Sequence, residues 1–173
     1  SKRAKAARAL EKAVAAELPA LKLERAKFIA EIESDPDNRQ RSGIDQIEFY
    51  VQTNPGTKPG PMMKVASGGE LSRFLLALKV SLADKGSAPT LVFDEIDTGV
   101  GGGVAEAIGV RLARLAANVQ VLTVTHAPQV AARALGHFLI AKEEAHPERV
   151  ATRVRKIDDD HRREEIARML AGS

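Results

Sequence analysis

Cysteine and tryptophan are both absent from this sequence of 173 residues. Without cysteine the chain can form neither a disulfide nor a thiolate metal site, which fits a reducing compartment. The aromatic residues are only five phenylalanines and one tyrosine, and they form no stacking cluster. Neither helix-turn-helix spacing nor a zinc-finger pattern is visible, so the sequence contains no motif that reads DNA bases.

Long hydrophobic runs are also missing, so no segment is predicted to span a membrane. The N-terminal segment SKRAKAARALEKAVAAELPA is basic but has no apolar core, so it is not interpreted as a secretory signal. Hydrophobic residues make up 44% and charged residues 28% of the chain, as in an ordinary globular domain. The net charge of +3 is too small to indicate nucleic-acid binding by itself. The default expectation is one soluble intracellular domain.

The hydrophobic pattern of the N-terminal part predicts one helix and two strands. Residues 2–18 form an alanine-rich helix whose apolar stripe suits the last turns of a coiled coil, and Pro19 ends it. The basic cluster at its start is most simply a solvated helix face, and a DNA contact is the minority interpretation. Apolar and polar residues alternate in residues 28–32 and 47–51, which predicts two strands with one wet face.

The central part of the chain predicts a helix followed by a βαβ unit. The helix has a buried face over residues 71–82 and ends at Lys85-Gly86. Strand 90–93, helix 101–118 and strand 119–125 then form the βαβ unit. Such a unit requires parallel strands and a right-handed crossover.

The C-terminal part continues the alternation of strands and helices. After a short helix, further strands are expected at residues 137–143 and 150–157. A helix with acidic residues at its start closes the chain and ends before Gly172. The predicted fold class is α/β, with a mainly parallel sheet flanked by helices.

Two adjacent glycines stand at a predicted helix start in VASGGELSR, residues 65–73. Ser67 and Glu70 have the spacing of a capping box, which satisfies free backbone N–H groups at a helix N-terminus. A capping box does not require Gly68 or Gly69, and a glycine costs up to about 1 kcal/mol relative to alanine in a helix. Glycine is favoured where another group approaches the backbone closely, and a helix N-terminus attracts anions. The motif therefore indicates a phosphate site.

Ionisable residues follow both strands of the βαβ unit. Asp94-Glu95 follows the first strand and His126 the second, and open parallel sheets bind ligands at that edge. An aspartate there can hold Mg²⁺, a second carboxylate can deprotonate water, and a histidine can stabilise charge on a terminal phosphate. The alternative is that the carboxylates cap a helix and that the histidine is structural. Their pairing at one edge, downstream of the two glycines, favours the functional interpretation.

The other histidines have no metal-ligand spacing, and no zinc site is suggested: His137, His146 and His161. The phosphate-binding loop G-x-x-x-x-G-K-[ST] is absent from the sequence. GVGGG, residues 99–103, does not complete a dinucleotide-binding pattern, because Val104 stands where the last glycine is needed. The chain thus contains a magnesium carboxylate and a base without the loop that cradles the phosphates.

Three motifs, in this order and spacing, resemble the C-terminal half of an ABC-type ATPase head: VASGGELSR, LVFDEIDTGVGG and VLTVTHAPQVAA. SGGELSR by itself is similar to the wider SMC and Rad50 group. DEIDTGVGG and THAPQVAA narrow the resemblance to the RecN family of SMC-like DNA-repair proteins. The resemblance covers nearly the whole chain. ABC transporters usually have glutamine where Glu70 stands, which argues against a transporter domain.

The resemblance implies a role for each of these motifs. Asp94 matches the aspartate that holds Mg²⁺, here through water, while Glu95 matches the catalytic base and His126 the switch histidine. The signature motif, which touches the γ-phosphate of ATP held by a second head, comprises Ser67, Gly68, Gly69 and Glu70. The D-loop comprises Asp97, Thr98 and Gly99. Gly101 stands where SMC proteins have a later D-loop aspartate, so it is open whether Asp97 replaces that residue.

The resemblance also implies partners and a division of the chain. Residues 1–18 would end a coiled coil, and residues 19–173 would form the C-terminal lobe of the head. An N-terminal lobe of the same protein would supply Walker A, and a homodimer of heads would bury ATP and Mg²⁺. DNA would be bound through its phosphates without sequence specificity, in the bacterial cytoplasm at the nucleoid.

The expected function is an ATP-binding and ATP-hydrolysing half-site that drives head dimerisation in double-strand-break repair. The fragment alone is expected to be inactive. The rival hypothesis is a non-catalytic DNA-organising scaffold, and Glu95 and His126 favour the enzyme because a scaffold needs no base. A head of a related Rad50 or SMC protein is the third interpretation, which DEIDTGVGG disfavours.

Overall fold

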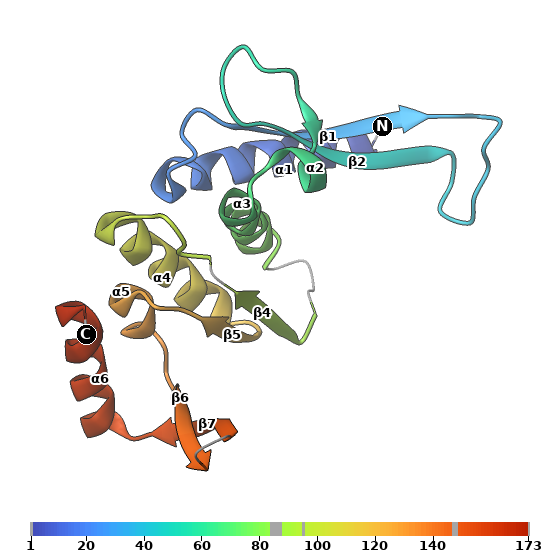
Figure 1. Ribbon diagram of the computed structural model, residues 1–173. Coiled ribbons are helices and arrows are strands. Elements are labelled where there is room, and N and C mark those ends of the chain that lie inside the picture. The colour runs from blue at the N-terminus through green and yellow to red at the C-terminus, as the bar shows by residue number, and fades with distance from the viewer. Residues whose placement is uncertain (1, 84–87, 95, 147–148, 173) are drawn as a thin grey trace.

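The computed structural model describes residues 2–83, 88–94, 96–146 and 149–172. Three small sheets succeed one another along the chain, and helices pack between them (Figure 1). One hydrophobic cluster extends from Val14 in the first helix to Val130 beyond the last parallel strand. The helix predicted to end at Lys85-Gly86 ends earlier, at Ser81, with Leu82 as its C-cap. Lys85 and Gly86 themselves lie outside the described residues.

The N-terminal part is an antiparallel sheet with a helix packed along it (Figure 1). Helix α1 (Lys2–Glu17) ends just before Pro19, as predicted, and a 3-10 turn η1 (Pro19–Leu21) leads to the sheet. The sheet comprises β1 (Lys27–Ser34), β2 (Asp45–Gln52) and the short β3 (Gly60–Pro61). The side chains that β1 and β2 bury in the same cluster as Val14 of α1 are Phe28, Ala30 and Val51. Both predicted strands are therefore confirmed.

One member of the basic cluster on α1 is bound to the sheet. Arg3 donates hydrogen bonds to the Asp45 carboxylate at 2.6 Å and to the Ser42 carbonyl at 2.6 Å. Hydrogen bonds from the Ser34 hydroxyl and from Arg3 lower the pKa of the Asp45 carboxyl. Arg3 thus fastens the start of α1 to the loop between β1 and β2.

The central helix α3 (Gly68–Ser81) follows the single-turn helix α2 (Met62–Val65) and contacts α1. It buries Phe74, Leu76 and Leu78, in agreement with the predicted buried face. Because its opposite side packs against the next helix, α3 lies between the antiparallel sheet and the βαβ unit (Figure 1).

The predicted βαβ unit is present. Strand β4 (Thr90–Asp94), helix α4 (Gly102–Ala116) and strand β5 (Gln120–Val124) follow one another, and the two strands are parallel. Their register pairs Thr90 with Gln120 and Asp94 with Val124, so both strands end at the same edge. The buried stripe of α4 is Ile108, Leu112 and Leu115.

The C-terminal part is a β-hairpin flanked by two helices. A single-turn helix α5 (Pro128–Ala131) precedes β6 (His137–His146) and β7 (Arg149–Ile157), and α6 (Asp159–Ala171) closes the fold. Among the described strands, β6 and β7 pair only with each other, antiparallel, and do not extend the parallel sheet. Only two residues separate them, whereas a parallel pair needs a crossover of a dozen residues or so. The α/β class is confirmed, with its parallel part in β4 and β5.

Both ends of α6 follow the prediction. The Asp158 side chain accepts the His161 backbone N–H at 2.9 Å, and Gly172 ends the helix with a φ of 75°. Arg162 of α6 donates to the carbonyls of Ala131 at 3.2 Å and Ala132 at 3.0 Å, which ties α6 to α5.

In the part of the chain that the structure describes, no helix is long and apolar enough to cross a bilayer.

Candidate functional site

The predicted capping box is formed at the start of α3. The Glu70 backbone N–H donates to Ser67 Oγ at 3.4 Å, and the Ser67 backbone N–H donates to Glu70 Oε2 at 3.1 Å. The Ser67 hydroxyl also donates to Glu70 Oε2 at 3.0 Å. Glu70 thus holds Ser67 in place at the exposed end of the helix.

The two glycines of the motif have different surroundings. A Cβ atom added at Gly69 would lie 3.3 Å from Arg73 Nη1 and 3.4 Å from the Thr98 carbonyl oxygen. The loop around Thr98 therefore lies close to the helix start at Gly69. A Cβ atom added at Gly68 would meet no atom within 4 Å. Packing in the described part of the chain gives no reason for a glycine at 68, so any close approach there comes from outside it.

Arg73 is a buried residue of the same helix that the sequence analysis did not single out. The residue is only 8% exposed, and its Nε has no hydrogen-bond partner among the described residues. Burial lowers the pKa of the guanidinium, and the nearby Glu70 carboxylate partly offsets this effect. The sequence feature that could have identified Arg73 is a positively charged residue within an otherwise apolar helix face, one turn after Gly69.

The strand ends bring Asp94 and His126 to one edge of the parallel sheet. Asp94 is the last residue of β4 and is exposed, while His126 comes two residues after β5. The His126 side chain is 74% exposed. Both groups are therefore accessible to a ligand at this edge. Glu95 lies outside the described residues.

The three D-loop candidates point in different directions. Thr98 and Gly99 are exposed, and Gly99 has a φ of 71°, a left-handed conformation that favours glycine. The Asp97 side chain is instead completely buried. Its Oδ2 accepts hydrogen bonds from the Thr125 hydroxyl and, at 3.1 Å, from the Ala127 backbone N–H.

The contacts of Asp97 join the loop after β4 to the loop after β5. The other carboxylate oxygen, Oδ1, lies 4.0 Å from His126 Nδ1 and has no hydrogen-bond partner in the described part of the chain. Asp97 and His126 were candidate residues from the sequence, whereas Thr125 was not. The sequence feature that could have identified Thr125 is a hydroxyl side chain directly before the candidate histidine.

A magnesium ion would find one suitable ligand here. Among the described residues, no three His, Asp or Glu side chains are grouped closely enough to hold a metal ion. Mg²⁺, however, is usually held by one or two carboxylates together with water and substrate phosphates. The exposed Asp94 carboxylate fits that kind of site, with the remaining ligands supplied by a nucleotide.

The outer face of the parallel sheet is apolar and uncovered by the described residues. Val92 and Leu122 are cross-strand partners, and they are 67% and 46% exposed. Val124, two residues further on, is 50% exposed. Side chains alternate along a strand, so Asp94 shares this face with Val92. A domain that covers the face would therefore reach Asp94.

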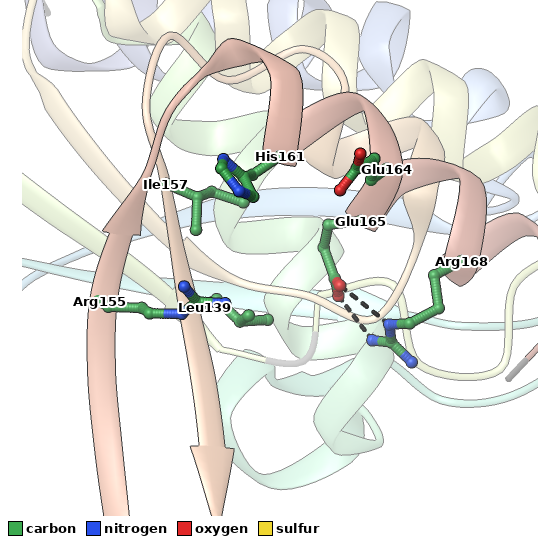
Figure 2. Close-up of a pocket in the computed structure, with 7 residues that line it drawn as sticks. All are labelled: Leu139, Arg155, Ile157, His161, Glu164, Glu165 and Arg168. Carbon is green, nitrogen blue, oxygen red and sulfur yellow. Dashed lines mark hydrogen bonds and ion pairs between the residues drawn. The ribbon is translucent and has the colours of Figure 1, made fainter.

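A separate cavity lies between the β6–β7 hairpin and α6 (Figure 2). Its volume is about 330 Å³, and its lining includes Arg155, His161 and Glu164. Glu165 accepts hydrogen bonds from Arg168 at 2.9 Å and 2.6 Å. Those bonds lower the pKa of the Glu165 carboxyl. None of the candidate residues from the three motifs lines this cavity, and we assign no site to it.

Comparison with known proteins identifies close relatives. No family model matches the chain. The chain is 45% identical over 171 residues to the DNA repair protein RecN of Rickettsia bellii, which is 99% of the chain and 31% of that relative. It is 42% identical over 166 residues to RecN of Halalkalibacterium halodurans, covering 94% of the chain and 29% of the relative. The chain thus spans about a third of the length of these curated relatives.

Two solved structures show the same fold. The chain matches the Smc head domain of Pyrococcus yayanosii with a TM-score of 0.66 and 17% identity, over 93% of the chain and 29% of that protein. It matches an SMC ATPase studied for its ATP-driven dimerisation and DNA-stimulated activation with a TM-score of 0.57 and 14% identity, over 96% of the chain and 94% of that protein. At this identity the matches establish the fold alone.

Proposed function

Since this chain belongs to the RecN family of DNA repair proteins and has the fold of an SMC head, we propose that it is the C-terminal half of an ATPase head. In this proposal, ATP binding and hydrolysis drive two heads together and apart during double-strand-break repair. The observation that supports it best is the meeting of the three motifs. Gly69 lies against Thr98, and Asp97 bonds the residues on either side of His126.

The proposed chemistry is hydrolysis of the γ-phosphate of ATP. Asp94 would hold Mg²⁺ through water, and Mg²⁺ supplies positive charge to the β- and γ-phosphates. Glu95, which directly follows Asp94 in the sequence, would accept a proton from the attacking water. The exposed imidazole of His126 would donate a hydrogen bond to the phosphate as charge develops on it.

The proposed contact of the signature is made with a second copy of the head. The start of α3 carries a partial positive charge, and its exposed Ser67 and open Gly68 leave room for a phosphate. The chain contains no Walker A loop of its own. The phosphate at this helix start would therefore be held by the other head, so that ATP serves as a removable part of a two-fold interface.

The N-terminal lobe of the same protein is the proposed cover for the apolar face of β4 and β5. Full burial of an exposed valine or leucine contributes about 1.5–3 kcal/mol. The side chains of this face are already partly buried, so docking would contribute a fraction of that value for each. The same docking would bring a Walker A loop towards Asp94, which shares the face. Residues 1–18 would continue into a coiled coil, and residues 19–173 would form the C-terminal lobe. DNA would bind through its phosphates, with an affinity that falls as salt is raised.

The isolated chain is expected to bind Mg-ATP negligibly and not to hydrolyse it. Without a P-loop it lacks the backbone N–H groups and the lysine that hold the phosphates. Calorimetric titration with Mg-ATP checks this, and circular dichroism shows that the sample is folded. The full-length protein is the positive control. Tight stoichiometric binding by the isolated chain would refute the half-site proposal.

Replacing Gly68 with alanine is expected to stabilise the head while weakening its dimerisation. Alanine is favoured in a helix by up to about 1 kcal/mol over glycine, and the structure leaves open space for the methyl group. In the dimer the methyl group would occupy the space of the phosphate, and we expect the ATP-dependent dimer to weaken about tenfold or more, a loss of about 1.4 kcal/mol. Thermal unfolding and analytical ultracentrifugation of the full-length protein measure the two effects.

Gly103→Ala is the matched control for this change. Gly103 also lies in the first turn of a helix, and a Cβ atom added there meets nothing within 4 Å. It should give a similar rise in stability with no change in dimerisation. Equal dimerisation by both variants would show that Gly68 does not face the phosphate.

A further inference from the structure

The buried carboxylate of Asp97 connects two segments that are far apart in the sequence. Asp97 lies just beyond β4, and Thr125 and Ala127 lie just beyond β5. The Asp97 side chain has no exposed surface, and one of its oxygens accepts both the Thr125 hydroxyl and the Ala127 backbone N–H, the latter at 3.1 Å. The residue between these two donors is His126, whose side chain is mostly exposed.

Asp97 therefore holds the residue before His126 and the residue after it, which limits the movement of the His126 backbone. A hydrogen bond to a buried carboxylate is strong, because charge-assisted bonds gain strength where water is excluded. Holding residues 125 and 127 leaves the backbone of His126 little freedom, so that its imidazole is directed out of the loop. Asp97 Oδ1 lies 4.0 Å from His126 Nδ1. A closure of about 1 Å would bring the two atoms within hydrogen-bond distance.

We propose that Asp97 is a positioning residue that holds the loop of His126 in place within its own head. This inference rests on the proposed ATPase function. The family resemblance only places Asp97 in the D-loop beside Thr98 and Gly99. In this structure those two neighbours are exposed, whereas the Asp97 carboxylate is buried and faces residues of its own head.

The loop that contains Asp97 also lies close to α3, the helix that begins with the signature motif. The Thr98 carbonyl, directly after Asp97, lies where it would be only 3.4 Å from a Cβ atom at position 69. The backbone of this loop therefore touches the start of α3 on one side, while its Asp97 side chain holds the histidine loop on the other.

The decisive experiment is a double-mutant cycle in the full-length protein. Asp97→Ala is expected to lower kcat by about 10- to 100-fold, because a small misplacement of a catalytic group has effects of that size. The KM for ATP should change little, since Walker A and Asp94 are untouched. In a His126→Ala background the same change should lower kcat by less than about twofold, because the two residues act as a unit. An equal loss in both backgrounds would overturn the proposal.

Two further variants separate positioning from general destabilisation. Asp97→Asn keeps an oxygen that can accept the Ala127 N–H, and it should recover much of the lost kcat. Val14→Ala creates a cavity where α1 packs on the antiparallel sheet, and it should lower thermal stability without changing kcat of the folded enzyme. If Asp97→Ala does not fold, Thr125→Val removes the hydroxyl that donates to Asp97 and accepts the Ala127 N–H at 2.9 Å. It should also lower kcat, and again not in the His126→Ala background.

A readout without hydrolysis separates this inference from the proposed function. The Ala127 amide donates to Asp97 Oδ2 at 3.1 Å and to Thr125 Oγ1 at 2.9 Å, and the Thr125 hydroxyl is itself held by Asp97. Hydrogen exchange of this amide should therefore be slow in the wild type, faster in Asp97→Ala and intermediate in Asp97→Asn. Unchanged exchange at Ala127 would overturn the positioning role even in an active enzyme. Faster exchange in a protein whose wild type does not hydrolyse ATP would retain the positioning role and refute the ATPase proposal instead.

Discussion

The Glu95→Gln form of the full-length protein should bind ATP and dimerise but hydrolyse ATP about 10² to 10⁴ times more slowly than the wild type. Glutamine has nearly the same shape as glutamate but cannot accept a proton from the attacking water. Asp94, the proposed Mg²⁺ ligand, remains in place beside it. ATP binding should therefore be retained, and the heads should accumulate as closed dimers, because in the proposed cycle hydrolysis opens the dimer.

Steady-state phosphate release and light scattering coupled to size-exclusion chromatography measure the two effects. Asp94→Asn is the matched control, since it removes a charge of the same kind from the neighbouring position. It should weaken Mg-ATP binding itself and should not accumulate dimers. Hydrolysis at the wild-type rate by Glu95→Gln would place the catalytic base elsewhere and would strengthen the scaffold interpretation.

Ser67→Arg should abolish ATP-dependent dimerisation and most hydrolysis while leaving the affinity of the monomer for ATP nearly unchanged. Ser67 is exposed at the start of α3, next to the open backbone of Gly68. A long charged side chain there would fill the space proposed for the γ-phosphate of the second head. The Walker A loop of the mutated head would not be affected, so nucleotide binding by each monomer should persist.

The capping box offers a different explanation, and Ser67→Ala distinguishes it. Loss of the cap should lower the free energy of unfolding by about 0.5–2 kcal/mol in either variant. If capping were the only role of Ser67, Ser67→Ala and Ser67→Arg would weaken dimerisation equally and in proportion to that loss. The trans-contact proposal instead requires a far larger effect from arginine. Thermal unfolding and sedimentation velocity of both variants supply the comparison.

Mixing Ser67→Arg with a Walker A mutant tests whether the contact is made in trans. In the heterodimer one composite site combines an intact Walker A with an intact signature, while the other site carries both defects. Partial activity in the mixture, with neither parent active, is the expected result. If tagged pull-down shows that heterodimers form and they are as inactive as both parents, the signature does not act across the interface.

The sequence by itself determined the features that depend on neighbouring residues. Ser67 and Glu70 are three residues apart, which is the spacing that a capping box needs when a helix begins after Ser67. The structure contains this capping box. The apolar spacing of α3 and α4 and the alternation in β1 and β2 arise from the fixed geometry of helix and strand. The βαβ unit was also predictable, since a strand, a helix long enough to cross over and a second strand favour parallel pairing, as β4 and β5 show.

The tertiary structure decided what depends on residues far apart in the chain. The short connection between the predicted strands 137–143 and 150–157 already excludes a parallel crossover between them. What only the structure decided is that, among the described strands, β6 and β7 pair with each other and do not join β4 and β5. Gly68 and Gly69 are adjacent residues of the same type, yet only Gly69 lies close to Thr98. The sequence cannot distinguish them, because Thr98 is about thirty residues further along the chain and only the fold brings it to this helix start. The Asp97 side chain points inward because Thr125 and Ala127 each donate a hydrogen bond to it where water is excluded. Only the pairing of β4 with β5 brings Asp97 next to these two donors.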